Sequence, residues 1–458
     1  MDGWRRTVAR KLPLAEALLQ SWCYLTDEDF LQGVFDRYRG RSYIGALSFA
    51  TIVHLVADAL LEHEGSGHRA IRRADERREL DASMEACYGK LRRIPQSLSH
   101  GFLAESTQRL RSVLVETPSP VPKSLRRFDV LAIDGKKVKH VAKRLLAARK
   151  FQGSVLGGKA LVALCLHTGL AVAMSSDVDG ETNDPPLVPE LLSQVRQVSS
   201  KPRLYVLDRQ FCDLKLPILL TEENDHFLIR YHPKVTFTRD PVRRVQRGKD
   251  RHGRGYREEW GWLGRPAHPR RRYVRRITLM RPGEESLVLV TDLLDATAYP
   301  AADLLELYRQ RWGIERVFQQ VTEVFHLRNL IATTPEGTIF QCAFCLLLYN
   351  LLQVQRSYLA DEQSLDVEQI SLENLFYDVR RQLITWSELL SPHWTVRHLK
   401  RAVTAQALSR RLHQLLDATW KNDWLKAPKK RIQPPPAKHA IAGGHTSVYR
   451  LIQKHLRP

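Results

Sequence analysis

Apolar residues recur every three or four positions over the first quarter of the chain, which is the spacing of amphipathic helices. The runs ALSFATIVHLVADALLEH and SHGFLAESTQRLRSVL show the pattern clearly. Residues 1–120 are therefore predicted to form a helical N-terminal region. A short polar stretch with three prolines, ETPSPVPKSLRR, follows and predicts a linker.

After the linker the pattern changes to short apolar runs that are typical of buried strands. These runs are FDVLAIDGKKV, ALVALCLH, LAVAMSSDV, RLYVLD and HFLIRY. A helix from about residue 186 to 198 is predicted between the third and fourth strands. Alternation of this kind indicates a mixed α/β sheet. Two of the strands end on an aspartate, Asp134 and Asp208, so both carboxylates are expected at the edge of a sheet, where a site can form.

The composition shifts again between residues 230 and 281, where 17 Lys and Arg face 4 Asp and Glu among many glycines and short β-like runs. We interpret about 230–285 as a basic, β-rich insertion. The strand SLVLVTDLL follows, and then a long helical stretch, AADLLELYRQRWGIERVFQQVTEVF. The predicted domains are thus a helical region at 1–120, an α/β catalytic domain at 125–335, and a helical region at 336–458 with a basic, proline-containing tail.

The charge balance favours a polyanionic partner. Lys and Arg number 71 against 50 Asp and Glu, a formal charge of +21. Nucleic acid is the favoured partner, although ribosome-like and membrane-surface proteins share the trait. The apolar run IFQCAFCLLLYNLLQV is too short for a membrane span and contains two polar amides, so we expect a buried helix and no membrane partner.

The six cysteines are scattered and suggest no disulfide framework. Cys342 and Cys345 form a C-x-x-C within that apolar run, but no second Cys or His pair lies at zinc spacing, so two buried thiols are expected. A reducing, cytoplasmic location is the expectation.

Two strand-end aspartates and a glutamate on a later helix are what a two-metal phosphodiester site requires. Mg²⁺ takes oxygen ligands and needs carboxylates from separate rigid elements. Glu315 is the helical candidate, because Tyr308 and Arg311 precede it by seven and four residues and share its helix face. The alternative is an ordinary amphipathic helix with an Arg–Glu pair on its solvent side.

The string from Tyr308 to Thr322 resembles the Y-x2-R-x3-E-x6-K signature of bacterial insertion-sequence DDE transposases, the group with the YREK signature. Three of the four positions match, while Thr322 stands where lysine is expected, and Arg316 or Arg328 are possible replacements for that lysine's phosphate contact. FDVLAIDGKKV and LYVLDRQFCD resemble the strands that carry the first two acids. GETNDPPLVPELL and LVTDLL are similar to the stretches between them and after the insertion. The likeness covers roughly residues 125 to 350.

The resemblance implies an RNase H-like mixed sheet flanked by helices, with a β-rich insertion and helical N- and C-terminal regions. It implies that Asp134, Asp208 and Glu315 bind two Mg²⁺ or Mn²⁺ ions, while Tyr308 and Arg311 hold phosphates near the transposon end. The reaction would be hydrolytic nicking to free a 3′-hydroxyl, followed by attack of that hydroxyl on target DNA. The expected partners are terminal inverted repeats, target DNA and a second copy of the chain in a synaptic complex, in a bacterial cytoplasm near the nucleoid. The N-terminal region is expected to recognise the transposon ends.

The insertion adds candidate DNA contacts. Trp260 and Trp262 are candidates for stacking on an extruded base, and the alternative is packing in the insertion's small core. Phosphate contacts are expected from a set of arginines for which a solvated basic face is the alternative: Arg243, Arg244, Arg270, Arg271, Arg272, Arg275 and Arg276.

Two other functions stay open from the sequence. One is a DNA-binding protein that derives from a transposase but is inactive, with Thr322 as the first sign of decay. The other is a metal-dependent nuclease without strand transfer, which the carboxylates alone do not exclude. The acidic trio, Asp134, Asp208 and Glu315, is intact, which favours an enzyme over the inactive protein.

Overall fold

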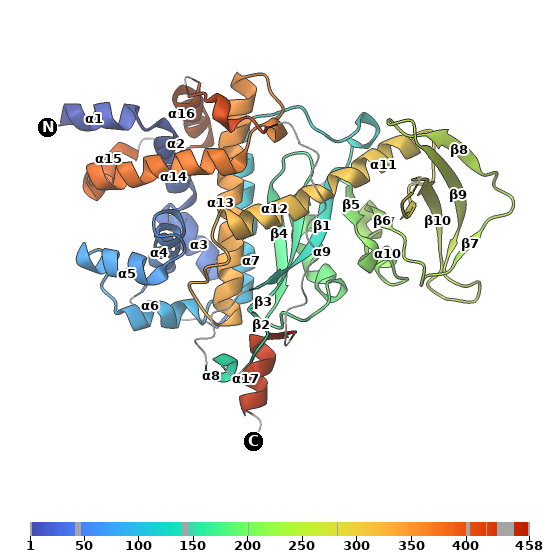
Figure 1. Cartoon of the computed structure of the whole chain (residues 1–458), viewed down its shortest axis with the longest axis horizontal. Helices are drawn as coiled ribbons and strands as arrows, with labels where there is room; N and C mark the ends of the chain where they lie inside the picture. Colours follow the sequence, from blue (N-terminus) through green and yellow to red (C-terminus); the bar gives the residue numbers. More distant parts are fainter. Residues whose placement is uncertain are drawn as a thin grey trace.

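A computed structural model of the chain describes residues 2–41, 47–139, 146–149, 151–199, 201–281, 283–399, 404–417, 419–427 and 444–456. Most of the proline-containing basic tail, residues 428–443, lies outside the described residues. Figure 1 shows a helical body at one end, a β-rich lobe at the other, and a sheet between them.

The N-terminal region is helical, as its apolar spacing predicts. Its helices are α1 (Asp2–Arg10), α2 (Pro13–Leu25), α3 (Glu28–Tyr38), α4 (Phe49–Leu61), α5 (Gly67–Glu76), α6 (Met84–Leu91) and α7 (Gln96–Arg111). Side-chain caps mark several starts, for example Ser48, which accepts a hydrogen bond from the backbone of Thr51 at the start of α4.

A ten-stranded mixed sheet runs through the centre of the molecule in the order β4-β3-β1-β5-β6-β11-β10-β9-β7, with β8 paired to β9. Its first half consists of β1 (Asp129–Val138), β3 (Gly158–Cys165), β4 (Ala171–Asp177), β5 (Arg203–Leu207) and β6 (His226–Arg230). β3 lies antiparallel to β1 and β4, whereas β5 is parallel to β1 and to β6. This mixed sheet, flanked by helices, confirms the predicted RNase H-like fold class.

The basic segment extends the same sheet and does not form a separate layer. Its strands are β7 (Phe237–Arg239), β8 (Gln246–Lys249), β9 (Gly255–Leu263) and β10 (Arg272–Leu279). β11 (Leu287–Thr291) then pairs with both β10 and β6, which joins the β-rich lobe to the central strands.

Helices cover both faces of the central strands. On one face lie α7, α11 (Ala301–Gln310), α12 (Trp312–Glu323) and α13 (Pro335–Glu362), and on the other lies α9 (Val188–Val198). α13 carries the C-x-x-C run, and both of its thiols are fully buried, as expected. By length and composition α13 passes the test for a membrane-spanning helix, but its apolar window is 100% buried in the protein core.

The C-terminal helices pack against the N-terminal ones. They are α14 (Leu372–Leu389), α15 (Pro392–Leu399) and α16 (Ala405–Leu416), and each of them contacts α2. The two helical regions thus share one hydrophobic core with one face of the sheet. Short elements complete the described chain: η1 (Lys123–Leu125), α8 (Leu146–Arg149), β2 (Ser154–Leu156), η2 (Pro185–Leu187), η3 (Arg209–Phe211), α10 (Leu216–Leu219), η4 (Glu222–Asn224), η5 (Val367–Gln369), η6 (Asn422–Trp424), β12 (His445–Ser447) and α17 (Val448–Leu456).

Candidate active site

Asp134 and Asp208 lie side by side at neighbouring positions of two parallel strands. Ile133 of β1 pairs with Leu207 of β5, and each aspartate is the next residue along its strand direction. Side chains alternate along a strand, so each aspartate points to the face opposite to its apolar predecessor. Ile133 and Leu207 pack in the core on the α9 side, which directs both carboxylates toward α11 and α12.

The third acid, Glu315, reaches this place from α12. The apolar residues Ile314, Val317, Phe318 and Val321 bury one stripe of the helix against the core. Arg311 keeps helical backbone angles between α11 and α12, φ −51° and ψ −33°, so the helical register continues across the junction. The one-face relationship expected for Arg311 and Glu315 is therefore present.

Arg311 joins two of the three acids. Its Nη2 lies 2.9 Å from Oε1 of Glu315, and its Nη1 lies 3.5 Å from Oδ2 of Asp134. The Arg311 side chain is 8% exposed, against 15% for Asp134 and 38% for Glu315. A buried guanidinium thus occupies the space where the first and third carboxylates approach each other.

Burial dominates the electrostatics of the two aspartates. It raises the pKa of Asp134 to about 6, although the charge of Arg311 and the backbone N–H of Gly135 oppose this shift. It also raises the pKa of Asp208, against a hydrogen bond from the backbone of Gln210. The negative charges of Asp208 and Asp184 also raise the pKa of Asp134, and those of Asp184 and Glu315 also raise the pKa of Asp208.

Tyr308 lies on the same side of the helix as Arg311. Its ring centroid is 5.7 Å from the guanidinium carbon, and the side chain is buried, which raises the pKa of its phenol. The hydroxyl has no hydrogen bond of normal geometry within the described part of the chain. A buried hydroxyl normally has a partner, so this one is available to a group that enters the site.

The sequence reasoning missed a fourth carboxylate, Asp184, in the polar turn before α9. It is 2% exposed and forms an ion pair with Lys159 of β3, which is also buried. The amide of Gln210, two residues after Asp208, donates to it as well. Gly135 leaves the room for this carboxylate, because a Cβ at that position would overlap it. In the sequence Asp184 looks like any turn aspartate, so no local signal distinguishes it.

A second missed residue is Lys136, which shares the strand face of Asp134. Its Nζ lies 3.4 Å from the carbonyl oxygen of Phe318 in α12, and burial lowers its pKa. The hydroxyl of Thr322 donates to the same carbonyl at 2.6 Å. A lysine ammonium from the neighbouring strand therefore lies beside the position where the signature expects a lysine on the helix.

Arg316, one of the two suggested replacements for that lysine, is engaged elsewhere. It is exposed and its Nη1 lies 3.0 Å from Glu368 of η5. Arg328 is exposed and lies beyond the end of α12. Neither contacts the acidic trio in this structure.

In the β-rich lobe, two of the expected DNA contacts are corrected by the structure. Trp260 is 2% exposed and donates from Nε1 to the carbonyl of Leu294, so it packs the lobe's core and is not available for stacking. Arg275 is fully buried, where it pairs with Glu258 and donates to the carbonyl of Tyr299. The alternating pattern of β9 and β10 points these two side chains inward, away from DNA.

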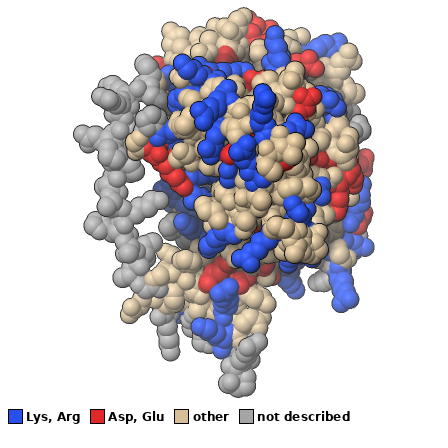
Figure 2. Space-filling model, turned by 90° about the vertical axis from the view of Figure 1, so that its right-hand side faces the viewer, with Lys and Arg blue, Asp and Glu red and all other residues tan. Residues whose placement is uncertain are grey.

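The other expected contacts of the lobe remain accessible. Arg243, Arg244 and Arg270 are exposed. Trp262, Arg271 and Arg272 are half-buried, and the guanidinium of Arg271 lies 4.0 Å from the Trp262 ring centroid. Arg276 instead pairs with Glu259. Figure 2, which faces this lobe, shows Lys and Arg side chains over much of its surface.

Among the described residues, no three His, Cys, Asp or Glu side chains are close enough together, as they stand, to hold a metal ion. The donor set nevertheless suits a hard cation, because Asp134, Asp208 and Glu315 supply carboxylates from three separate elements. Burial raises the pKa of both aspartates, and a cation between them would oppose that shift by stabilising the charged carboxylates. For a cation to bind among the three carboxylates, their side chains must rotate and Arg311 must move out of the space between Asp134 and Glu315.

A comparison with protein families matches the segment that carries this site. The transposase DDE domain family matches residues 126–351. No curated protein matches the sequence. Among solved structures, the chain is similar to piggyBac transposase in a cryo-EM structure of its synaptic complex with hairpin DNA, at 12% identity, with 90% of this chain and 88% of that chain covered and a TM-score of 0.36. The segment that this family matches, residues 126–351, includes all three acids of the candidate site.

Proposed function

We propose that this protein cuts and joins DNA ends by metal-dependent phosphoryl transfer at Asp134, Asp208 and Glu315. The observation that carries the proposal is the placement of two strand-end aspartates at adjacent positions of parallel strands, facing the helix that presents Glu315. The match of this segment to the transposase DDE domain family supports the same conclusion.

The three carboxylates would hold Mg²⁺ or Mn²⁺, with two ions as the expected number. Bound there, the ions would supply charge neutralisation at the reacting phosphate. The chain's own residues position the DNA: Tyr308 offers a buried, unpartnered hydroxyl, and Arg311 offers a guanidinium that is free to bind a phosphate once a cation takes over its carboxylate partners.

Lys136 supplies the cation that Thr322 does not. Its ammonium lies on the Asp134 face of β1, 3.4 Å from the carbonyl oxygen of Phe318 and 5.8 Å from the centroid of that residue's ring. A phosphate oxygen is a stronger partner for an ammonium than a carbonyl at 3.4 Å. The departure from the expected signature at Thr322 is thus compatible with an active enzyme.

Recognition of the transposon ends is assigned to the helical region at residues 1–120, and residues 125–335 perform the chemistry. Two copies of the chain would act together, because the joining of two DNA ends requires two active sites. The basic surface of the β-rich lobe supports DNA as the partner, since most of its accessible arginines face solvent (Figure 2).

A strand-transfer assay distinguishes the proposal from its alternatives. The substrate is a duplex with a free 3′-hydroxyl end taken from the DNA that flanks the gene, and the target is supercoiled plasmid with Mg²⁺ or Mn²⁺. Covalent joining of the duplex to the plasmid supports a transposase. Nicking of DNA without joining indicates a nuclease, and DNA binding without either reaction indicates an inactive, transposase-derived protein.

A further inference from the structure

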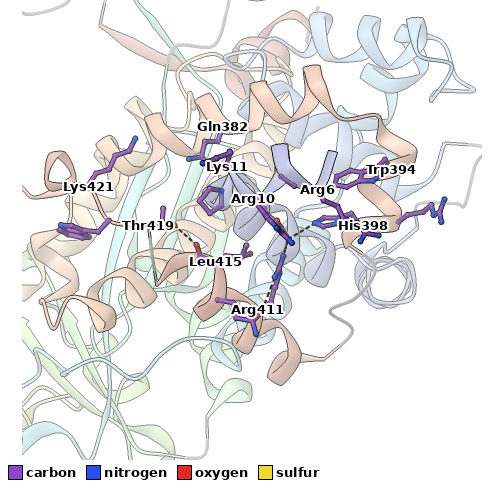
Figure 3. A pocket seen from close by; sticks show the side chains of 16 residues that line it. Arg6, Arg10, Lys11, Gln382, Trp394, His398, Arg411, Leu415, Thr419 and Lys421 are labelled. Atoms are coloured by element: carbon purple, nitrogen blue, oxygen red, sulfur yellow. Dashed lines mark hydrogen bonds and ion pairs between the residues drawn. The ribbon is translucent and has the colours of Figure 1, made fainter. Parts of the chain in front are cut away.

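A basic cleft lies in the helical body, between the N-terminal helices and the C-terminal ones. It is bounded by α1, α2, α15 and α16 and has a volume of about 730 Å³. Figure 3 shows side chains from these separate helices around one hollow. In Figure 1, α1, α15 and α16 lie at the opposite end of the molecule from β8, β9 and β10, with β1, β5 and α12 between them.

Cations dominate the lining of the cleft. They are Arg6, Arg10, Lys11, Arg397, Arg411 and Lys421, whereas Glu16 is the single acidic residue that lines it within the described part of the chain. Lys421 is paired with Asp378 at 2.8 Å. Among the described residues, Arg6, Arg10, Lys11 and Arg397 have no ion-pair partner, and all four are exposed.

Glu16 is already paired with other residues in the wall of the cleft. Glu16 is 1% exposed and accepts hydrogen bonds from Arg411 and from His398, the latter at 3.1 Å. Burial alone would raise the pKa of Glu16, but these two partners outweigh burial and lower it, so the carboxylate stays charged. This buried cluster ties α2 to α15 and α16 and leaves the four unpaired cations without a carboxylate of their own.

The start of α2 and a smaller pocket adjoin the cleft. The start of α2 faces it, and the side-chain oxygen of Gln382 from α14 accepts from the backbone of Leu14 and Ala15 at 2.9 and 3.2 Å. The positive end of the helix dipole therefore adds to the field of the cations. Next to it, a smaller pocket of about 310 Å³ shares Glu16 and Arg411 with the cleft and is lined by Gln20.

We propose that this cleft binds the phosphodiester backbone of duplex DNA outside the cut site. Small-molecule pockets are mainly apolar with few polar groups, whereas this cleft gathers like charges from three elements, which favours a polyanion. A duplex held both here and at the β-rich lobe would pass the strand ends that carry Asp134 and Asp208. The inference rests on the proposed DNA transaction and gives the helical body a defined part in it.

The test compares two variants that lose equal charge. The cleft variant is Arg6→Ala/Arg10→Ala/Arg397→Ala, and the control is Arg69→Ala/Arg72→Ala/Arg77→Ala, at three exposed positions on α5 and at its C-terminal end. Affinity for a random-sequence duplex of about 40 base pairs is measured by fluorescence anisotropy over a range of salt concentrations. We expect the cleft variant to bind roughly tenfold or more weakly near 0.1 M salt, with a salt slope lower by about two to three, because each lost phosphate contact lowers the slope by about one. The control should change much less.

Equal losses in the two variants would overturn the proposal, because the effect would then be one of net charge. A cleft variant that binds the duplex as the wild type does, but no longer binds inorganic phosphate, would overturn it too, because the cleft would then be a small-anion site. Arg6→Lys/Arg10→Lys/Arg397→Lys keeps the charge and should retain most of the affinity, which separates lost contacts from misfolding. The duplex affinity is measured without a divalent cation, so a failure of the proposed chemistry at Asp134, Asp208 and Glu315 is seen separately from a failure of the cleft.

Discussion

Arg311 donates a hydrogen bond of 2.9 Å to Glu315, one helical turn further along. The same guanidinium also approaches Asp134 of the sheet at 3.5 Å. A helix-surface pair of this kind would ordinarily be solvated and weak. Here Arg311 is buried and Glu315 is half-buried beside the strand-end carboxylate of Asp134. The guanidinium therefore occupies the space that cations and phosphate would enter.

The Arg311 guanidinium is expected to matter for DNA cleavage. Arg311→Lys keeps one charge but not the fork that spans two carboxylates, and Arg311→Ala loses both. We expect DNA cleavage to fall about 10²-fold or more in Arg311→Ala and less in Arg311→Lys, the size typical of a lost charge-stabilising group. Nicking rates at saturating DNA measure the effect. Wild-type rates in both variants would show that Arg311 only fills the empty site.

Lys136 is expected to supply the cation that the helix lacks at Thr322. Lys136→Met should lower the nicking rate about tenfold or more, as expected for the loss of a charged hydrogen bond to phosphate. Lys137→Met is the matched control, because the neighbouring side chain points to the opposite face of β1. Introducing Thr322→Lys into the Lys136→Met protein should restore part of the rate. No restoration, together with unchanged DNA affinity, would argue against this role.

The buried ion pair of Lys159 and Asp184 is expected to stabilise the folded protein around the site. Lys159→Met leaves a carboxylate that is 2% exposed without its cation, and we expect a loss of about 3–5 kcal/mol in the free energy of unfolding. Adding Asp184→Asn should recover much of that loss, since the uncompensated charge is then removed. Urea denaturation of the two single variants and the double variant measures the coupling. Strictly additive losses would mean that the two residues act independently.

The sequence predicts the main site residues because their signals are local. Asp134 and Asp208 end apolar strands, and the spacing of Arg311 and Glu315 defines a helix face. Asp184 escapes prediction because its significance depends on the strand pairing that brings Lys159 beside it and on the space left by Gly135. Trp260 and Arg275 show the converse: both belong to a basic, aromatic-rich segment, and only the register of β9 and β10 decides that they point inward.

The packing of the two terminal helical regions against each other could not be predicted from the sequence either. Apolar spacing predicts helices in both terminal regions, but it does not show that α2 packs against α14 and α16 to form one body. The buried ion cluster of Glu16 with Arg411 and His398 joins residues almost 400 positions apart in the sequence. No local pattern marks such a contact.

The buried ion cluster of Glu16, His398 and Arg411 predicts that the stability of the protein depends on pH. The pKa of Glu16 is lowered in the folded state by His398 and Arg411, despite burial. The group therefore adds stability above the unfolded pKa, near 4.3, and loses that contribution as the pH falls through its lower folded value. Glu16→Gln should destabilise the protein at neutral pH by about 1–3 kcal/mol, because Arg411 loses a charged partner. The difference from wild type should shrink below about pH 4. A difference that is constant with pH would contradict the assignment.

The most direct test of the acidic trio is the rate of Mn²⁺- and Mg²⁺-dependent nicking of supercoiled plasmid by Asp134→Asn, Asp208→Asn and Glu315→Gln. Glu323→Gln, an exposed acid on the same helix as Glu315, serves as the control. We predict that each trio variant loses nicking by at least about 10³-fold while DNA binding persists, and that the control retains the wild-type rate. Full activity in any one of the three variants would contradict the proposed site.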